Sequence, residues 1–129
     1  MDCSRGPKPL FGFGMRIYYV TLNTADEARQ ISRVLLEKQF AVCTNWFPIT
    51  CAYRWEGKTA EEAETVLVIK TQSGYRSTIE QVIREHINYT NFIAEIAPEF
   101  VNEGYLKWLN TEVPVAANRE GCQPANSKQ

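Results

Sequence analysis

A run of sixteen residues, Phe40 to Trp55 (FAVCTNWFPITCAYRW), decides how this chain must fold. It is β-rich, yet strands usually span only about 3–10 residues. Pro48 has no N–H to give to a strand ladder, so we expect an edge position, a bulge or a bend there. The run carries four large aromatic residues that are costly to leave in water: Trp46, Phe47, Tyr53 and Trp55. We therefore expect a projecting hairpin arm that is covered by self-association. The alternative is one kinked strand folding back over its own core.

The segments before this run predict a strand and then a helix. Arg16 to Leu22 (RIYYVTL) is β-branched and aromatic, which favours a central strand. Thr24-Ala25-Asp26-Glu27 has the spacing of a capping box, in which the two polar side chains satisfy free backbone amides. A helix should follow to about Lys38, with these apolar residues turned inward: Ala28, Ile31, Val34 and Leu35.

The segments after the run repeat this order. Glu56-Gly57-Lys58 predicts a turn, 59–64 is polar and acidic, and Thr65 to Lys70 predicts a second central strand. A helix is expected from about Ser73, a short strand over Asn91 to Ala97, and a final helix over Asn102 to Thr111. Apolar spacing places these residues on one face of the first of those helices: Tyr75, Ile79, Val82, Ile83 and His86. The order βαββαβ predicts an α+β, ferredoxin-like sandwich with a C-terminal helix.

Length and composition limit the classes of protein. The 129 residues suit one domain, and we expect a flexible leader over 1–14, the folded domain over 15–113 and a disordered tail over 114–129. The net charge of −1 argues against a nucleic-acid partner. The longest apolar runs fall well short of the roughly 18 residues of a membrane span. The sequence has no CxxC, and Cys43 and Cys51 would lie about 26 Å apart on one strand. A reducing, cytoplasmic setting is therefore expected.

The ordered motifs resemble the CutA divalent-cation tolerance family. They are Val20-Thr21, Glu27-Ala28-Arg29 with Ile31, Ala41-Val42-Cys43-Thr44-Asn45, Tyr53-Arg54-Trp55-Glu56-Gly57-Lys58, Ile69-Lys70-Thr71 and Tyr105-Leu106-Lys107-Trp108-Leu109. The resemblance implies a homotrimer with PII-like architecture, linked to tolerance of copper and other divalent metals, without a known reaction. The family's His-Pro-Tyr and Pro-Glu-Ile segments are altered here to a run from His86 to Ile96 without proline. That loop belongs to the family's intersubunit cleft.

Three residues are candidate metal ligands, each with a structural alternative. His86 is the one histidine and imidazole suits copper and zinc, although a histidine near a helix C-terminus also caps the helix. Cys43 is a soft ligand, or a small buried hydrophobe. Glu56 is a carboxylate ligand, or part of a polar turn at the tip of the arm.

The expected ligand cleft draws on five further residues: Tyr53, Trp55, Lys70, Tyr89 and Trp108. The aromatic residues could line a pocket and Lys70 could hold an anion, although packing and solvation are the simpler alternatives. No residue is assigned to catalysis, because the sequence has one histidine and lacks Gly-x-Ser-x-Gly, the P-loop and Gly-x-Gly-x-x-Gly. The first hypothesis is a metal-binding, non-enzymatic homotrimer without an organic cofactor. The second is a PII-like signalling or scaffolding module whose cleft or arm binds a small ligand or a partner protein.

Overall fold

The computed structural model describes residues 14–116, which form four strands and three helices. In chain order these are β1 (Met15–Leu22), α1 (Ala25–Glu37), β2 (Cys43–Trp55), β3 (Lys58–Gln72), α2 (Arg76–Arg84), β4 (Ile93–Ile96) and α3 (Glu103–Glu112). The predicted βαββαβ order with a final helix is confirmed. The expected leader, except for Gly14, and most of the expected tail lie outside the described residues.

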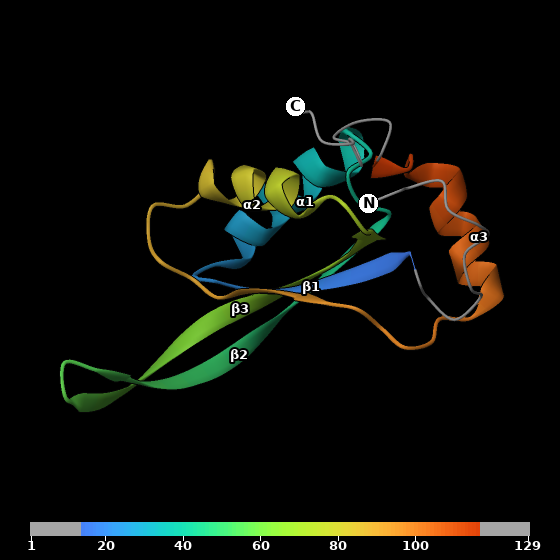
Figure 1. Cartoon of the computed structure of the whole chain (residues 1–129). Helices are drawn as coiled ribbons and strands as arrows, with labels where there is room; N and C mark the ends of the chain where they lie inside the picture. The colour runs from blue at the N-terminus through green and yellow to red at the C-terminus, as the bar shows by residue number, and fades with distance from the viewer. Residues whose placement is uncertain (1–13, 117–129) are drawn as a thin grey trace, which may run out of the picture.

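The four strands form one antiparallel sheet in the order β2-β3-β1-β4. Helices α1 and α2 lie side by side over one face of this sheet, and α3 lies at one end of it (Figure 1). The core fills the space between that face and the two helices. Its largest fully buried side chains include Tyr18, Leu22, Ile31, Leu35, Leu67, Ile69 and Ile79. The fold is therefore of the α+β class, as the pattern of segments predicts.

The capping box at the start of α1 is confirmed. The Glu27 amide donates to Thr24 Oγ1 at 3.1 Å, and the Thr24 amide donates to Glu27 Oε1 at 3.2 Å. From this fixed start, the apolar positions of the helix fall on the sheet. Ala28, Ile31 and Leu35 are fully buried, and Val34 packs against the same core.

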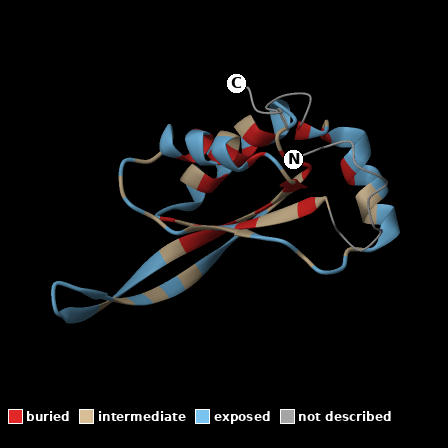
Figure 2. Cartoon of the chain, in the orientation of Figure 1, coloured by how far each residue is buried: buried red, intermediate tan, exposed pale blue. Residues whose placement is uncertain are grey.

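Strands β2 and β3 form the expected arm. They pair without interruption from Cys43↔Lys70 to Trp55↔Lys58, whereas the pairing of β1 with β3 already ends at Leu22↔Thr65. The part of the hairpin beyond that point projects from the body and is largely exposed (Figures 1 and 2). Pro48 sits opposite Thr65 on the outermost strand, so the edge position was the correct one of the three expectations for it. The alternative of one kinked strand folded back over the core is wrong.

Several predicted boundaries need correction. The strand expected over Thr65 to Lys70 begins at Lys58, so the acidic stretch 59–64 is part of β3, where pairing with β2 outweighs its low strand propensity. Helix α2 begins at Arg76 and not at Ser73, and it ends at Arg84. Strand β4 is shorter than predicted, because only Ile93 to Ile96 pair with β1.

The last residue of α3 and the residues after it are strapped onto the body by three side chains. Gln39 Nε2 donates to the Glu112 carbonyl at 3.0 Å, Gln72 Nε2 to Val113 at 2.7 Å, and the Tyr75 hydroxyl to Pro114 at 2.6 Å. Within the expected tail, Pro114 accepts one of these bonds and Ala116 is buried, whereas Val115 is exposed.

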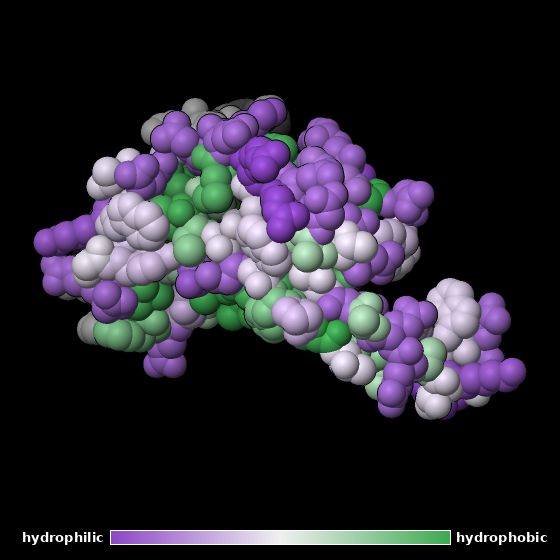
Figure 3. Space-filling view, turned by 180° about the vertical axis from the view of Figure 1, so that it is seen from behind, coloured by the Kyte–Doolittle hydropathy of each residue, from purple (hydrophilic) through white to green (hydrophobic). Residues whose placement is uncertain are grey.

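The sheet face away from α1 and α2 keeps apolar side chains at its surface. Strand alternation and register place Tyr19, Phe47 and Ile96 on this open face, where they are 36%, 44% and 45% exposed. Figure 3 shows apolar side chains reaching the surface along the lower side of the body, at the base of the arm. An apolar surface of this kind usually marks a contact with another molecule.

Candidate functional site

Cys43 begins β2 at the end of the sheet nearest α3. It sits opposite Lys70 in the register, and both side chains point to the open face. The thiol is free and half-buried, and Sγ lies 3.9 Å from the Thr44 carbonyl oxygen. Two expected functional residues are therefore neighbours across one strand pair.

Helix α3 places an aromatic cover over this pair. The Lys70 ammonium lies 5.7 Å from the centre of the Tyr105 ring. The Trp108 ring packs edge-on against the same ring, with 5.4 Å between the two ring centres. The Tyr105 hydroxyl is buried and faces the Cys43 thiol. Burial first, and the thiol second, raise the pKa of Tyr105 to about 12. Tyr105 was not among the predicted site residues, although it belongs to the Tyr-Leu-Lys-Trp-Leu motif.

His86 does not lie on a helix face as predicted, because α2 ends two residues earlier. Its amide donates to the Ile83 carbonyl at 2.9 Å, and its ring Nδ1 lies 2.8 Å from the Val82 carbonyl oxygen. A carbonyl only accepts hydrogen bonds, so Nδ1 carries a proton in this contact, and in the neutral tautomer with that proton Nε2 is the nitrogen with the lone pair. Histidines that bind metals commonly have this arrangement, with the other ring nitrogen fixed by a carbonyl or carboxylate.

Glu56 occupies the turn at the tip of the arm. Its φ of 51° and the φ of 81° at Gly57 are both positive, as a tight two-residue hairpin requires. Glu56 is exposed, and thirteen residues of extended chain, about 40 Å, separate it from Cys43. Glu56 and Cys43 of one chain therefore cannot share a metal ion.

The five expected cleft residues fall in three separate places. Lys70 and Trp108 meet around Tyr105, as described above. Tyr53 and Trp55 lie far along the arm, where Trp55 is 65% exposed. The pKa of Tyr53 is raised, first by burial and then by the hydrogen bond with Glu62. One chain therefore brings no more than two of the five residues together in any one place.

Tyr89 is held at the start of α1, away from Lys70 and Trp108. Its hydroxyl donates to Glu27 Oε1 at 2.6 Å and accepts from the Asn23 amide at 2.8 Å. Burial, followed by the bond to Glu27, raises the pKa of Tyr89 to about 12. These bonds give Tyr89 a structural role in fixing the loop after α2 to α1.

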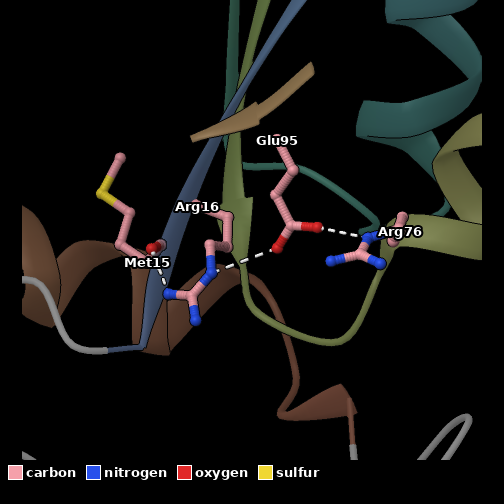
Figure 4. Close-up of polar contacts among 4 residues, drawn as sticks. All are labelled: Met15, Arg16, Arg76 and Glu95. Carbon is pink, nitrogen blue, oxygen red and sulfur yellow. Dashed lines mark hydrogen bonds and ion pairs between the residues drawn. The ribbon is translucent and has the colours of Figure 1, made fainter. Parts of the chain in front are cut away.

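A charged cluster that the sequence did not predict joins three elements at the sheet end near Cys43. Glu95 on β4 accepts from Arg16 Nε at 3.1 Å and from Arg76 Nε at 2.6 Å, and Arg16 also donates to the Met15 carbonyl at 2.8 Å (Figure 4). Burial first, and Glu95 second, raise the pKa of the neighbouring Tyr18. Both Glu95 oxygens are committed, so this cluster clamps β4 to β1 and α2.

Within residues 14–116 no three His, Cys, Asp or Glu side chains lie close enough together to hold a metal ion. The candidate donors His86, Cys43 and Glu56 suit copper or zinc by their chemistry, but one chain keeps them apart. No helix in the same range is both long and apolar enough to cross a membrane.

The sequence of this chain is similar to that of a known protein family. The sequence model of the CutA1 divalent ion tolerance proteins matches residues 16–112, well over half of the chain. The chain belongs to the CutA1 family. The resemblance inferred from the ordered motifs is thereby confirmed.

Curated CutA relatives come from several kingdoms. The CutA homolog of Xenopus laevis is 37% identical over 98 residues, which cover 74% of this chain and 65% of that protein. The divalent-cation tolerance protein CutA of Archaeoglobus fulgidus is 32% identical over 96 residues, covering 74% and 94%. Human protein CutA is 35% identical over 95 residues, covering 70% and 52%. The match thus spans less than two thirds of the frog and human proteins.

Solved CutA structures share the fold. The structure of the protein from Archaeoglobus fulgidus, described as a periplasmic divalent cation tolerance protein, has a TM-score of 0.72 at 30% identity and covers 76% of this chain and 97% of that one. CutA from Synechococcus elongatus has a TM-score of 0.74 at 25% identity, with 80% and 93% covered. The antiparallel sheet and its helices are therefore those of CutA proteins.

Proposed function

We propose that this chain acts in metal tolerance as a homotrimer that binds copper or another divalent ion between its subunits and catalyses no reaction. The observation that carries the proposal is the hydrogen bond from His86 Nδ1 to Val82, which leaves Nε2 available as a ligand. The family is also named for tolerance of divalent ions and not for a reaction.

The separation of the candidate ligands supports a site between subunits. Glu56 at the tip of the arm and Cys43 at the base of β2 can approach one ion only if they come from different copies. The open face, with Tyr19, Phe47 and Ile96 at its surface, offers a surface on which copies can associate. A PII-like trimer is the assembly that the family resemblance implies.

Copper is the ion we propose first. Imidazole suits copper, and a thiolate would favour its reduced form, so His86 and Cys43 together make copper a better partner than magnesium or calcium. Both described cysteines are free thiols, which suits a reducing compartment and supports the proposed cytoplasmic location.

A calorimetric titration tests the metal site. Cu(II), with Zn(II) as comparison, is added at pH 7 to reduced full-length protein, because ligands bind in their deprotonated forms. Saturation near one ion per subunit or per trimer, lost in His86→Ala and in His86→Asn, supports the proposal. The second variant is the matched control, because its amide can still donate to Val82 but cannot replace Nε2. Unchanged binding in both variants would return His86 to a structural role. A monomer mass by light scattering at micromolar concentration would contradict the trimer.

A second candidate function is a PII-like signalling or scaffolding module. It is favoured by the cluster in which Lys70 and Trp108 both contact Tyr105, since a cation beside aromatic rings suits a small anionic ligand. A thermal-shift screen with nucleotides and small anions tests it, because a bound ligand stabilises the folded protein. Stabilisation that disappears in Lys70→Gln supports this function, and no stabilised condition counts against it.

A further inference from the structure

A groove of about 320 Å³ lies between α1 and the outermost strand β2, on the helix side of the sheet. Its lining residues are Arg29, Ser32, Arg33, Leu36, Glu37, Thr44 and Trp46, none of which belongs to the candidate metal or cleft residues. Helical spacing brings the α1 residues to one face, and strand alternation turns Thr44 and Trp46 toward it. The volume lies at the small end of the range for small-molecule sites.

Ser32 is the residue of this groove that indicates a bound ligand. The residue is only 3% exposed, and its Oγ has no hydrogen-bond partner within the described part of the chain. A buried hydroxyl without a partner is costly, so native proteins rarely keep one without a reason. A ligand that supplies an acceptor at this wall of the groove would remove the cost.

The charges of the groove indicate what kind of ligand fits. Arg29 is already committed, with an ion pair to Asp26 at 3.4 Å and a position 5.9 Å from the centre of the Trp46 ring. Arg33 is exposed and has no ion pair among residues 14–116. Glu37 is the one acidic residue of the lining, and it forms no ion pair with either arginine among residues 14–116.

We propose that this groove binds a small carboxylic acid with an apolar body. The fork of the Arg33 guanidinium matches a carboxylate, and the Ser32 hydroxyl donates to the same group. Leu36 and the partly exposed Trp46 ring contact the apolar body. One uncommitted guanidinium and one hydroxyl suit a single negative charge better than a phosphate, which carries more charge. This proposal does not depend on metal binding at His86 or Cys43.

Fluorine NMR with 4-fluorophenylacetate as the probe tests the proposal on the full-length protein at pH 7. Its neutral counterpart, 4-fluorophenylacetamide, is the matched ligand control. We expect saturable binding of the acid and at least about tenfold weaker binding of the amide, as for the loss of a charge-assisted hydrogen bond. Arg33→Gln should weaken binding of the acid by a similar factor. Ser32→Ala should weaken it about threefold or more while the protein stays folded, because the variant removes an unpaired polar group.

Arg84→Gln is the matched protein control. Arg84 is an exposed helical arginine on α2 outside the groove, so this variant should bind the acid like the wild type. Equal binding of the acid and the amide overturns the proposal, and so does wild-type affinity in both groove variants. An absence of saturable binding up to about 10 mM also overturns it, since a probe of this size should be detected there. The same absence of binding is expected if a second copy of the chain fills the groove.

Discussion

Tyr89 donates a 2.6 Å hydrogen bond to Glu27, the same carboxylate that accepts from the Thr24 amide to complete the cap of α1. One side chain thus joins the loop after α2 to the first turn of α1, although 62 residues separate the two in sequence. The loop after α2 therefore has its own means of attachment, and Tyr89 serves the fold first.

Removing the hydroxyl of Tyr89 should destabilise the protein. We expect Tyr89→Phe to lower the free energy of unfolding by about 1–2 kcal/mol, as for a hydrogen bond to a charged group that is partly open to water. Urea denaturation measures the change. Tyr19→Phe is the control, because the exposed Tyr19 has a ring contact with Phe92 and, among residues 14–116, no hydrogen bond from its hydroxyl. Equal effects of the two substitutions would contradict the assignment.

Stability should fall at alkaline pH through two half-buried phenols. The pKa values of Tyr89 and Tyr105 are raised to about 12 in the folded chain, against 10 in the unfolded chain. The folded state therefore holds more protons between pH 10 and pH 12, and the stabilisation is lost as the pH rises through that window. Urea denaturation across this pH range should show a weaker pH dependence in Tyr89→Phe and in Tyr105→Phe. Ultraviolet titration in which every tyrosine of the folded protein ionises near pH 10 would contradict this.

The strap after α3 should control access to Cys43. Gln72→Ala leaves the Val113 carbonyl without its donor and loosens the end of the helix that carries Tyr105. We expect alkylation of Cys43 to accelerate on the order of tenfold, which corresponds to ~1.4 kcal/mol less opening free energy. Mass spectrometry of the modified peptides measures each thiol separately. Cys51 on the arm is the internal control, and an equal change at both cysteines would mean general loosening and not a local cover.

The clamp at Glu95 should matter more than an ion pair on a helix surface. Glu95→Gln removes the charge that Arg16 and Arg76 share, at a site where the Glu95 side chain is only 16% exposed. We expect a loss of about 1–3 kcal/mol, below the cost of breaking a fully buried pair because Arg76 is open to solvent. The control is Glu80→Gln, which breaks an exposed pair with Arg84 and should cost about 0.5 kcal/mol or less. Similar losses would contradict a special role for Glu95.

Gly74 should tolerate no side chain. Its φ is +95°, and an added Cβ would lie 2.5 Å from the Ala116 Cβ, so Gly74→Ala combines backbone strain with a clash. We expect a loss of at least about 2–3 kcal/mol. Gly57→Ala is the matched control, because Gly57 has φ +81° but open space around it and should show only the strain, about 1–2 kcal/mol. Thermal or urea unfolding separates the two, and equal losses would mean that the strap does not press on Gly74.

Much of the fold could be predicted because its signals are local. Thr24 and Glu27 form their capping box within one turn, and Ala28, Ile31 and Leu35 follow the helical period, so α1 was predictable from neighbouring residues alone. The acidic stretch before Thr65 was not recognised as strand. Its extended form depends on a partner strand and not on its own residues.

The candidate site was predictable as a set of residue types and not as an arrangement. Cys43 and Lys70 were singled out separately, and only the strand register makes them neighbours. His86 was assigned to a helix face because the apolar period continues past Arg84, whereas the chain leaves the helix there. The roles of Tyr89 and Glu95 rest on contacts between distant segments, which no short motif records.

The sequence by itself thus determined the order of elements, the family and the long arm, because periodicity, capping and turn residues act over a few positions. Only the tertiary structure decided that Tyr105 covers Cys43 and that Gln39, Gln72 and Tyr75 strap down the end of α3. It also decided that His86, Cys43 and Glu56 form no common cluster within residues 14–116. Those facts depend on which surfaces the folded chain brings together. Packing between segments that are distant in sequence decides which surfaces meet, and the preferences of neighbouring residues do not.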